Sequence, residues 1–237
     1  MLALALHDLL QELDNVARQA GRPSPRLLAV SKFQDATAVA ELAAAWRRER
    51  PGEVPAFGEN YVQEAQAKQA ALADPGLEWH LVGHLQSNKA REAATLFDWV
   101  QSVDRVKLVT ALATHRDPNR APLNVLVQVN IDDEASKHGC RPGDVPLLAD
   151  AIAMQPRLAL RGLMAIPAPL PDLQRRREAF RRMRELFDRL RTTCPQADTL
   201  SMGMSDDAAL AVAEGATMVR VGTALFGARP VKPGTPQ

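Results

Sequence analysis

Short apolar runs alternate with helical segments along the whole chain, and this alternation restricts the fold more than any other feature of the sequence. Eight runs have the length and composition of buried strands, and they lie at residues 27–31, 54–57, 79–82, 99–103, 125–130, 160–166, 199–202 and 218–221. Helical periodicity is found at residues 36–49, 60–73, 86–95, 104–115, 143–154, 172–191 and 206–214. Strands separated by helices pair in parallel, and eight such units can close without a free sheet edge. The sequence therefore predicts an α/β fold, a single (β/α)₈ TIM barrel.

The two ends of the chain extend this prediction. An amphipathic helix is expected ahead of the first strand, with an apolar face made of Leu2, Leu6, Leu9, Leu13 and Val16. Acidic residues and the lack of a basic start distinguish this segment from a signal peptide. We expect the helix and barrel to form one domain over residues 1–228, and residues 229–237, which are rich in proline, to form a flexible tail.

Composition excludes several classes of function. The 29 basic and 28 acidic residues give a net charge of +1, which would not attract nucleic acid or an anionic membrane. The arginine-rich segment 172–191 also carries apolar residues at helical spacing, as the wet outer helix of a barrel does. No apolar run is long enough to cross a membrane. We therefore expect no nucleic-acid or membrane partner.

Cysteine and histidine spacing predicts neither disulfides nor metal binding. Cys140 and Cys194 lie in unrelated contexts without a metal-ligand spacing, which fits a reducing compartment and a cytoplasmic location. His80 and His84 are separated by a strand end and Gly83, so they do not share a helix face as zinc-binding histidine pairs do. We expect no metal site.

The end of the first predicted strand carries a lysine. The sequence LLAVSK places Lys32 directly after an apolar run, at the mouth of the barrel. A lysine partly removed from water has a lowered pKa and keeps more neutral amine to attack an aldehyde. Position alone also fits a lysine that simply ends a strand in water.

The last two strands end in residues suited to a phosphate. Strand seven leads into LSMGMSDD and strand eight into VRVGTALFG. In this fold the loops after these strands, with the N-terminus of a short helix, commonly bind phosphate through backbone N–H groups and hydroxyls. A single hydroxyl there could equally cap an ordinary turn. A reactive lysine near a phosphate site would serve either a sugar-phosphate aldolase or a protein that binds pyridoxal 5′-phosphate (PLP).

Longer motifs favour the second alternative. The segments AVSK, FGENYVQE, WHLVGHLQSNK, VLVQVNIDDEASKHGC, RGLMAI, LSMGMSDD and VRVGTALFG, which run from residue 29 to residue 227, resemble those of the YggS/PROSC family of pyridoxal phosphate homeostasis proteins. That family is similar to the barrel domain of alanine racemase, the type III fold of PLP proteins. The resemblance implies eight cofactor-binding residues, namely Lys32, Asn60, His84, Met164, Ser201, Arg220, Gly222 and Thr223.

The resemblance also implies a role for each of these residues. Lys32 would form a Schiff base with PLP. The phosphate would be held by Ser201, Gly222 and Thr223. Arg220 would face the pyridine nitrogen, and the cofactor would be lined by Asn60, Met164 and His84. Many relatives carry a second lysine two positions after the first, where this chain has Gln34, so a role for a second amine is not expected here.

Two features favour binding over catalysis. An arginine donates to the pyridine nitrogen and keeps it unprotonated, which makes the ring a weaker electron sink. Racemisation needs a second acid–base group, and Tyr61, the one tyrosine, is expected to begin a helix instead. We therefore expect a cytoplasmic carrier without catalytic residues, which supplies PLP to apoenzymes, and closure of the barrel within one chain favours a monomer. A PLP-dependent racemase-like enzyme is the alternative.

Overall fold

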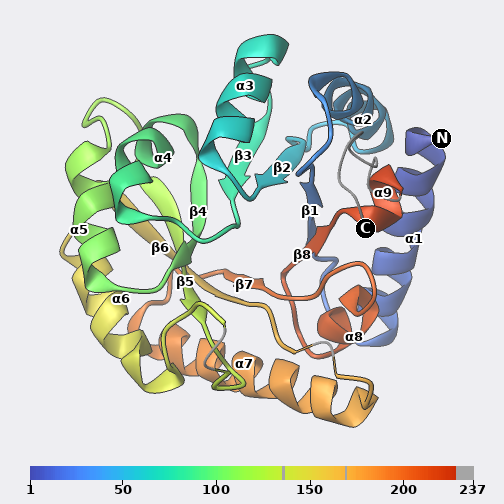
Figure 1. Ribbon diagram of the computed structural model, residues 1–237. Helices are drawn as coiled ribbons and strands as arrows, with labels where there is room; N and C mark the ends of the chain where they lie inside the picture. Colours follow the sequence, from blue (N-terminus) through green and yellow to red (C-terminus); the bar gives the residue numbers. More distant parts are fainter. Residues whose placement is uncertain (135–136, 169, 228–237) are drawn as a thin grey trace, which may run out of the picture.

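Eight parallel strands form a closed barrel in the order β1 to β8, and pairing of β1 with β8 closes the ring (Figure 1). The computed structural model describes residues 1–134, 137–168 and 170–227. The strands are β1 (Arg26–Val30), β2 (Ala56–Glu59), β3 (Glu78–Leu81), β4 (Trp99–Val103), β5 (Leu123–Val129), β6 (Leu158–Ala165), β7 (Thr199–Ser201) and β8 (Met218–Val221). The predicted (β/α)₈ barrel is confirmed.

Helices surround the barrel and cover the outer face of its strands (Figure 1). The longer ones are α1 (Leu2–Gln19), α2 (Ala36–Glu49), α3 (Val62–Leu72), α4 (Ala90–Leu96), α5 (Val106–His115), α6 (Val145–Ala153) and α7 (Leu173–Thr193). The shorter ones are η1 (Ser87–Lys89), η2 (Pro142–Asp144), α8 (Ala208–Ala213) and α9 (Thr223–Phe226). The predicted tail, residues 229–237, lies outside the described residues. No helix in the described ranges combines the length and the apolar character that a membrane span requires.

One predicted strand begins two residues too early. Val54 was expected in the second strand, but β2 starts at Ala56 and the Val54 side chain is 53% exposed. Pro55 lies between them, and a proline has no N–H to donate to a neighbouring strand. The ladder can therefore begin only after it.

The main hydrophobic core lies between the barrel and its helices. Leu27 and Ala29 of β1 belong to this core, together with the buried face of α1. Leu28, which lies between them, belongs instead to a separate cluster with Ala56, Val82 and Met218. Since successive side chains of a strand point to opposite faces, this second cluster fills part of the barrel interior.

The N-terminal helix α1 forms as predicted and packs against α2, α8 and α9 (Figure 1). Its fully buried residues are Leu6, Leu9, Leu10, Leu13 and Ala17. Leu2 and Val16, expected on the apolar face, are only partly buried at its edges. All eight strands are parallel, so the loops after them open at one end of the barrel, the end at which functional groups gather in this fold.

Candidate functional site

Lys32 lies in a tight turn at the carboxyl end of β1. It is half-buried and follows the last residue of β1 by two positions, at the end of the barrel where the loops after the strands open. The turn is closed by a hydrogen bond from Gln34 N to Ser31 O of 3.0 Å. Phe33 has a φ of 65°, a left-handed conformation that is unfavourable for a residue with a side chain.

A buried ion pair between β2 and α3 holds this turn. Lys68 Nζ, from α3, donates to Ser31 O at 2.7 Å and to Glu59 Oε1 at 2.6 Å. Ser31 Oγ donates to the same carboxylate oxygen at 2.6 Å. The Glu59 side chain is fully buried and that of Lys68 is 8% exposed. The backbone oxygen and the side-chain hydroxyl of Ser31, the residue before Lys32, are therefore both held by the pair of Glu59 and Lys68.

The same carboxylate has one oxygen without a partner. Glu59 Oε2 is buried and makes no hydrogen bond among the described residues. Burial raises the pKa of Glu59, although hydrogen bonds from Lys68 and Ser31 act in the opposite direction. A second acid of α3, Glu64, accepts a 3.3 Å hydrogen bond from Phe33 N through Oε2. Three side chains packed around one turn therefore decide where the Lys32 backbone lies.

Arg220 lies inside the barrel and not on its solvent side. Its side chain belongs to β8, and the residue is 4% exposed. Nη1 donates to Ser201 Oγ at 2.7 Å and Nη2 to Ala165 O at 2.8 Å. Burial lowers the pKa of Arg220 to about 10, so the guanidinium is still protonated at neutral pH. No ion pair joins it to a carboxylate within the described part of the chain.

Hydrogen bonds continue from Arg220 through the barrel. Ser201 Oγ donates to Gln101 Oε1 at 2.7 Å, and Gln101 Nε2 lies 2.9 Å from His80 Nδ1. His80 Nε2 lies 2.7 Å from Glu78 Oε1. Ser201 is on β7 and Gln101 on β4, two strands that do not neighbour each other, so their bond crosses the interior. We call these five residues, Arg220, Ser201, Gln101, His80 and Glu78, the interior polar chain.

The carboxylate that ends the interior polar chain, Glu78, lies at the amino-terminal end of the strands, opposite the mouth. Glu78 is the first residue of β3 and accepts a 2.6 Å hydrogen bond from Arg26 Nη2, at the start of β1. The hydrogen bonds from His80 and the charge of Arg26 lower the pKa of Glu78 to about 2, against the desolvation that burial causes. Burial lowers the pKa of His80, so its ring is neutral at neutral pH.

Gly222 and Thr223, two of the predicted phosphate ligands, lie directly after β8. Thr223 is the first residue of α9 and is exposed, so its hydroxyl is open to a ligand. A Cβ at Gly222 would lie 3.2 Å from Val30 O, a tight contact that glycine avoids. N–H groups in the first turn of a helix have no partner within that helix. By contrast, Ser201, the third predicted phosphate ligand, is fully buried and bonded to Arg220 and Gln101.

The three residues predicted to line the cofactor lie in different surroundings. Asn60 follows β2 and His84 follows β3, both at the mouth. A Cβ on Gly83 would lie 2.2 Å from Asn60 O, so this glycine lets the two strand ends approach. Met164 is fully buried in β6 and packs with Trp99 and Leu126, deeper in the barrel.

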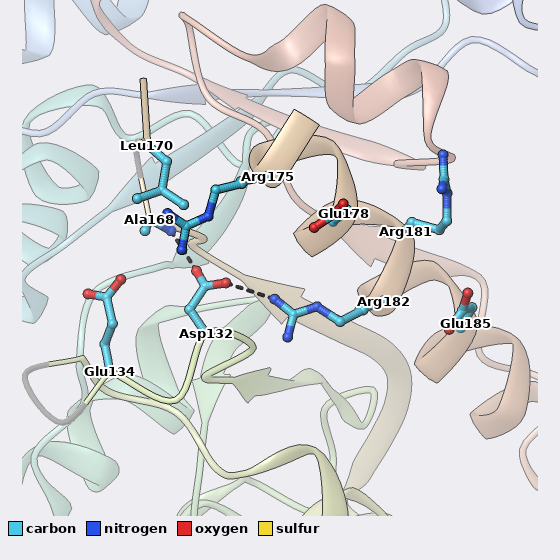
Figure 2. Close-up of a pocket in the computed structure, with 9 residues that line it drawn as sticks. All are labelled: Asp132, Glu134, Ala168, Leu170, Arg175, Glu178, Arg181, Arg182 and Glu185. Carbon is cyan, nitrogen blue, oxygen red and sulfur yellow. Dashed lines mark hydrogen bonds and ion pairs between the residues drawn. The ribbon is translucent and has the colours of Figure 1, made fainter. Parts of the chain in front are cut away.

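A cavity of about 670 Å³ lies elsewhere, between the loops after β5 and β6 and helix α7 (Figure 2). It is lined by Asp132, Glu134, Ala168, Leu170, Arg175, Glu178, Arg181, Arg182 and Glu185. In Figure 2, Arg175 and Arg182 both point toward Asp132, and Arg182 Nη2 donates to its Oδ1 at 3.1 Å. The lining includes none of the predicted site residues, and its mixed charges would not select an anion. We therefore place the site at the barrel mouth.

Several residues of the site were not singled out from the sequence. Glu59 and Lys68 stand in the FGENYVQE motif and just after it, and a glutamate inside a buried strand is a sign of a charged partner. Gln101 and Glu78 could not be recognised in the same way, because a polar residue in a strand usually faces solvent. In this closed barrel their side chains face the interior instead.

Comparisons with known proteins show which family this chain resembles. The family described as the alanine racemase N-terminal domain matches residues 4–230. A Pseudomonas aeruginosa protein named pyridoxal phosphate homeostasis protein is 53% identical over 215 residues, 90% of this chain and 89% of that protein. An Escherichia coli protein of the same name is 48% identical over 231 residues, 94% of this chain and 96% of that protein.

Solved structures give the same result for the fold. PipY of Synechococcus elongatus, solved with PLP bound, has 38% sequence identity and a TM-score of 0.79, and the match covers 96% of this chain and 100% of that chain. Alanine racemase of Corynebacterium glutamicum matches 98% of this chain and 63% of its own, with a TM-score of 0.66 and 17% identity. The second likeness concerns the fold alone, and it confirms the predicted alanine racemase type of barrel.

Proposed function

The chain belongs to the family of pyridoxal phosphate homeostasis proteins, and we propose that it binds PLP through the Lys32 amine and takes part in the homeostasis of this cofactor. The single observation that supports this most directly is the similarity over nearly the whole chain to PipY, which was solved with PLP bound. When bound, PLP supplies an aldehyde that forms a Schiff base with a lysine and a ring that can withdraw electrons.

The residues present fit such a cofactor. An amine and an exposed hydroxyl, on Lys32 and Thr223, stand at the mouth after β1 and β8, which are paired strands. Gly222 lets β8 approach the end of β1 closely, since a Cβ there would lie 3.2 Å from Val30 O, and this brings the start of α9 near the Lys32 turn. Arg220 offers a buried cation without a carboxylate partner in the described residues, which suits a neutral acceptor such as the pyridine nitrogen. Asn60, Met164, His84 and Ser201 complete the proposed cofactor-binding set.

The chemistry of Arg220 favours carriage over catalysis. A guanidinium with a pKa of about 10 does not give up its proton at neutral pH, so it can only donate to the ring nitrogen. A ring with an unprotonated nitrogen stabilises a carbanion poorly. Tyr61, the one tyrosine, precedes α3 and is 54% exposed, a surface position that does not suit the second acid–base group of a racemase. We propose a monomeric carrier that supplies PLP to apoenzymes.

Spectroscopy and mass spectrometry of the purified protein test this proposal. We expect a visible absorption band in the presence of PLP, loss of that band in Lys32→Ala, and retention in Lys107→Ala, which removes an exposed lysine of α5. Borohydride reduction followed by peptide mapping is expected to place the cofactor adduct on Lys32. An unchanged spectrum in Lys32→Ala would reject the proposal.

The same preparation separates the alternatives. Sustained, Lys32-dependent racemisation of an amino acid, followed by chiral chromatography, would favour a racemase-like enzyme over a carrier. A reduced adduct with the mass of a sugar-phosphate carbonyl would favour an aldolase. Transfer of PLP to an apoenzyme, measured as recovered activity of that enzyme, would support carriage.

A further inference from the structure

Two histidines and an aspartate form a cluster at the barrel mouth. His84 follows β3, Asp104 directly follows β4, and His138 lies in the loop after β5. One nitrogen or oxygen atom of each lies within 4.8 Å of the others. The two imidazole rings are stacked, with centroids 3.7 Å apart, and His84 Nδ1 is 3.9 Å from Asp104 Oδ2.

The loop that carries His138 is fixed by its own hydrogen bonds. Gln128 Nε2, from β5, donates to His138 O at 3.1 Å. Cys140 N donates to Gln128 O at 2.9 Å, and Cys140 forms a β-bridge with Val129. Gly139 has a φ of 122°, and a Cβ there would lie 2.7 Å from Asn130 N. These contacts set the backbone position of His138, whose side chain is exposed.

The carboxylate is fixed in a similar way. Asp104 Oδ1 pairs with Arg105 Nη1, and Arg105 Nη2 donates to Leu85 O at 2.8 Å. This leaves Asp104 Oδ2 on the side of His84.

We propose that His84, Asp104 and His138 bind a divalent transition-metal ion of the zinc class through two imidazole nitrogens and one carboxylate oxygen. Stacked rings 13° apart do not aim their in-plane lone pairs at one ion, so the exposed His138 ring turns out of the stack when the ion binds. Imidazole suits zinc, nickel and copper, and three protein ligands leave a further position for water or an anion. His80, the other histidine of this segment, is not part of the site because it is fully buried in the interior polar chain. His84 also belongs to the proposed cofactor-binding set, so the metal site is tested on protein without PLP.

Metal titration of the purified full-length protein, freed of PLP, tests the site. Zn²⁺ is measured by competition with a chromophoric chelator, and Co²⁺ by its visible absorption. We expect one equivalent to bind, and we expect His138→Gln and Asp104→Asn each to weaken binding at least about tenfold. The control is His115→Gln, which removes a histidine from the last turn of α5, at the other end of the barrel.

Each outcome decides the question. Binding that is lost in both site variants and kept in the control supports the site. Equal binding by all four proteins, or no Zn²⁺ binding to the parent chain, overturns it. If a site variant unfolds, its circular dichroism shows this, and the intense visible bands of tetrahedral Co²⁺ in the parent protein become the deciding measurement, with a weak octahedral spectrum counting against the site.

A second inference concerns the interior polar chain and rests on separate observations. Ser201 Oγ donates to Gln101 and accepts from Arg220, so Gln101 turns its amide oxygen to Ser201 and its Nε2 to His80. His80 Nδ1 must then be an acceptor, and its proton lies on Nε2 and is donated to Glu78. Every donor along the chain points from the cation Arg220 toward the anion Glu78.

We infer that this one-way chain fixes the orientation of Arg220, and that Gln101 and His80 are positioning residues for the group that faces the cofactor ring. A buried cation that makes no direct ion pair is costly unless oriented dipoles and nearby charges stabilise it, and Asp207 acts on Arg220 only through its charge. The chain supplies such dipoles and connects Arg220 to a carboxylate at the far end of the strands. The part of this inference that concerns the ring rests on the proposed function.

Two measurements test it independently. Without cofactor, ¹⁵N NMR at pH 8 is expected to show His80 protonated on Nε2 alone. A ring protonated on Nδ1, or one that titrates near the ordinary value, would overturn the inference. With PLP, Gln101→Leu is expected to weaken binding about tenfold or more, and to shift the pH at which the visible band changes.

The control for Gln101→Leu is the next residue of β4. Ser102 is buried and its hydroxyl has no partner among the described residues, so Ser102→Ala is expected to leave both readouts unchanged. Wild-type affinity and band in Gln101→Leu would refute the positioning role. Failure of the parent protein to take up PLP would instead reject the proposed function, while the NMR result would still decide the direction of the chain.

Discussion

Replacing Lys68 by methionine tests the ion pair beneath the Lys32 turn. The change removes the amine that donates to Ser31 O at 2.7 Å and to Glu59 Oε1 at 2.6 Å, and it keeps the length of the side chain. Glu59 is fully buried and would be left with one donor, Ser31 Oγ. Breaking a buried pair by removing one partner costs about 3–5 kcal/mol, so we expect a loss of this size at pH 8.

The loss is expected to shrink as the pH falls. Burial already raises the pKa of Glu59 above its ordinary value of 4.5, and removing Lys68 raises it further. A carboxyl group whose pKa is higher in the folded than in the unfolded protein stabilises the fold at a pH below its pKa in the unfolded protein. This stabilisation is lost as the pH rises toward its pKa in the folded protein. Within that window the free energy of unfolding of Lys68→Met falls by about 1.4 kcal/mol for each pH unit. The variant is therefore closest to wild type near pH 5.

Urea denaturation at pH 5 and pH 8 measures both effects. Trp46, Trp79 and Trp99 are all at least 95% buried, so their fluorescence reports global unfolding. The matched control is the double variant Lys68→Met, Glu59→Gln, which removes the charge but keeps an acceptor for Ser31. We expect it to regain much of the loss and to have little of the pH dependence. A loss below about 1 kcal/mol at pH 8, or an equal loss at both pH values, would refute this account of the pair.

Three further predictions concern other parts of the molecule. Gly83→Ala places a Cβ 2.2 Å from Asn60 O and is expected to lower the free energy of unfolding, measured by urea denaturation, by about 2 kcal/mol or more. The control is Gly143→Ala, where a Cβ meets no atom within 4 Å, and this change is expected to be neutral or slightly stabilising. Equal effects of the two changes would contradict the close approach of β2 and β3. Burial raises the pKa of Cys140 to about 12, so at pH 7.5 a thiol reagent is expected to modify this residue only on unfolding, and rapid labelling of native protein would be the contrary result. Asp35 caps α2 by accepting from Ala38 N at 2.8 Å, and Asp35→Ala is expected to lower stability by about 1 kcal/mol, with an unchanged midpoint as the opposing result.

The strands and helices were predictable because hydrophobic periodicity alone determines them. The predicted helix 36–49 agrees with α2 at both ends, and the predicted strand 99–103 agrees with β4. The start of β2 was predicted two residues too early, because Val54 was assigned to the strand although a proline follows it. Strand ends are set by which backbone groups can pair, and this depends on neighbours that are distant in sequence.

Part of the site could be predicted for the same reason. Lys32, Gly222 and Thr223 lie at strand ends, and in a parallel barrel every strand end of one kind opens on the same mouth. The ion pair of Glu59 with Lys68 could not be derived, because it requires knowing that α3 returns across the end of β1. The placement of Ser201 also differs from a simple expectation, since its hydroxyl is used inside the barrel by Gln101 and Arg220.

Two buried charged systems on opposite faces of the sheet explain how this mouth can be ordered before a ligand arrives. Outside the barrel, Glu59 and Lys68 fix the backbone that carries Lys32. Inside it, the interior polar chain fixes the guanidinium of Arg220. Neither system contacts the other, because side chains alternate between the two faces of each strand. The backbone that carries the amine and the guanidinium of Arg220 are therefore held by independent supports, so little ordering free energy needs to be spent when a ligand binds at this mouth. It follows that effects of Lys68→Met and Gln101→Leu on PLP affinity should add as free energies, and a coupling well above about 0.5 kcal/mol between them would show that the two supports act as one.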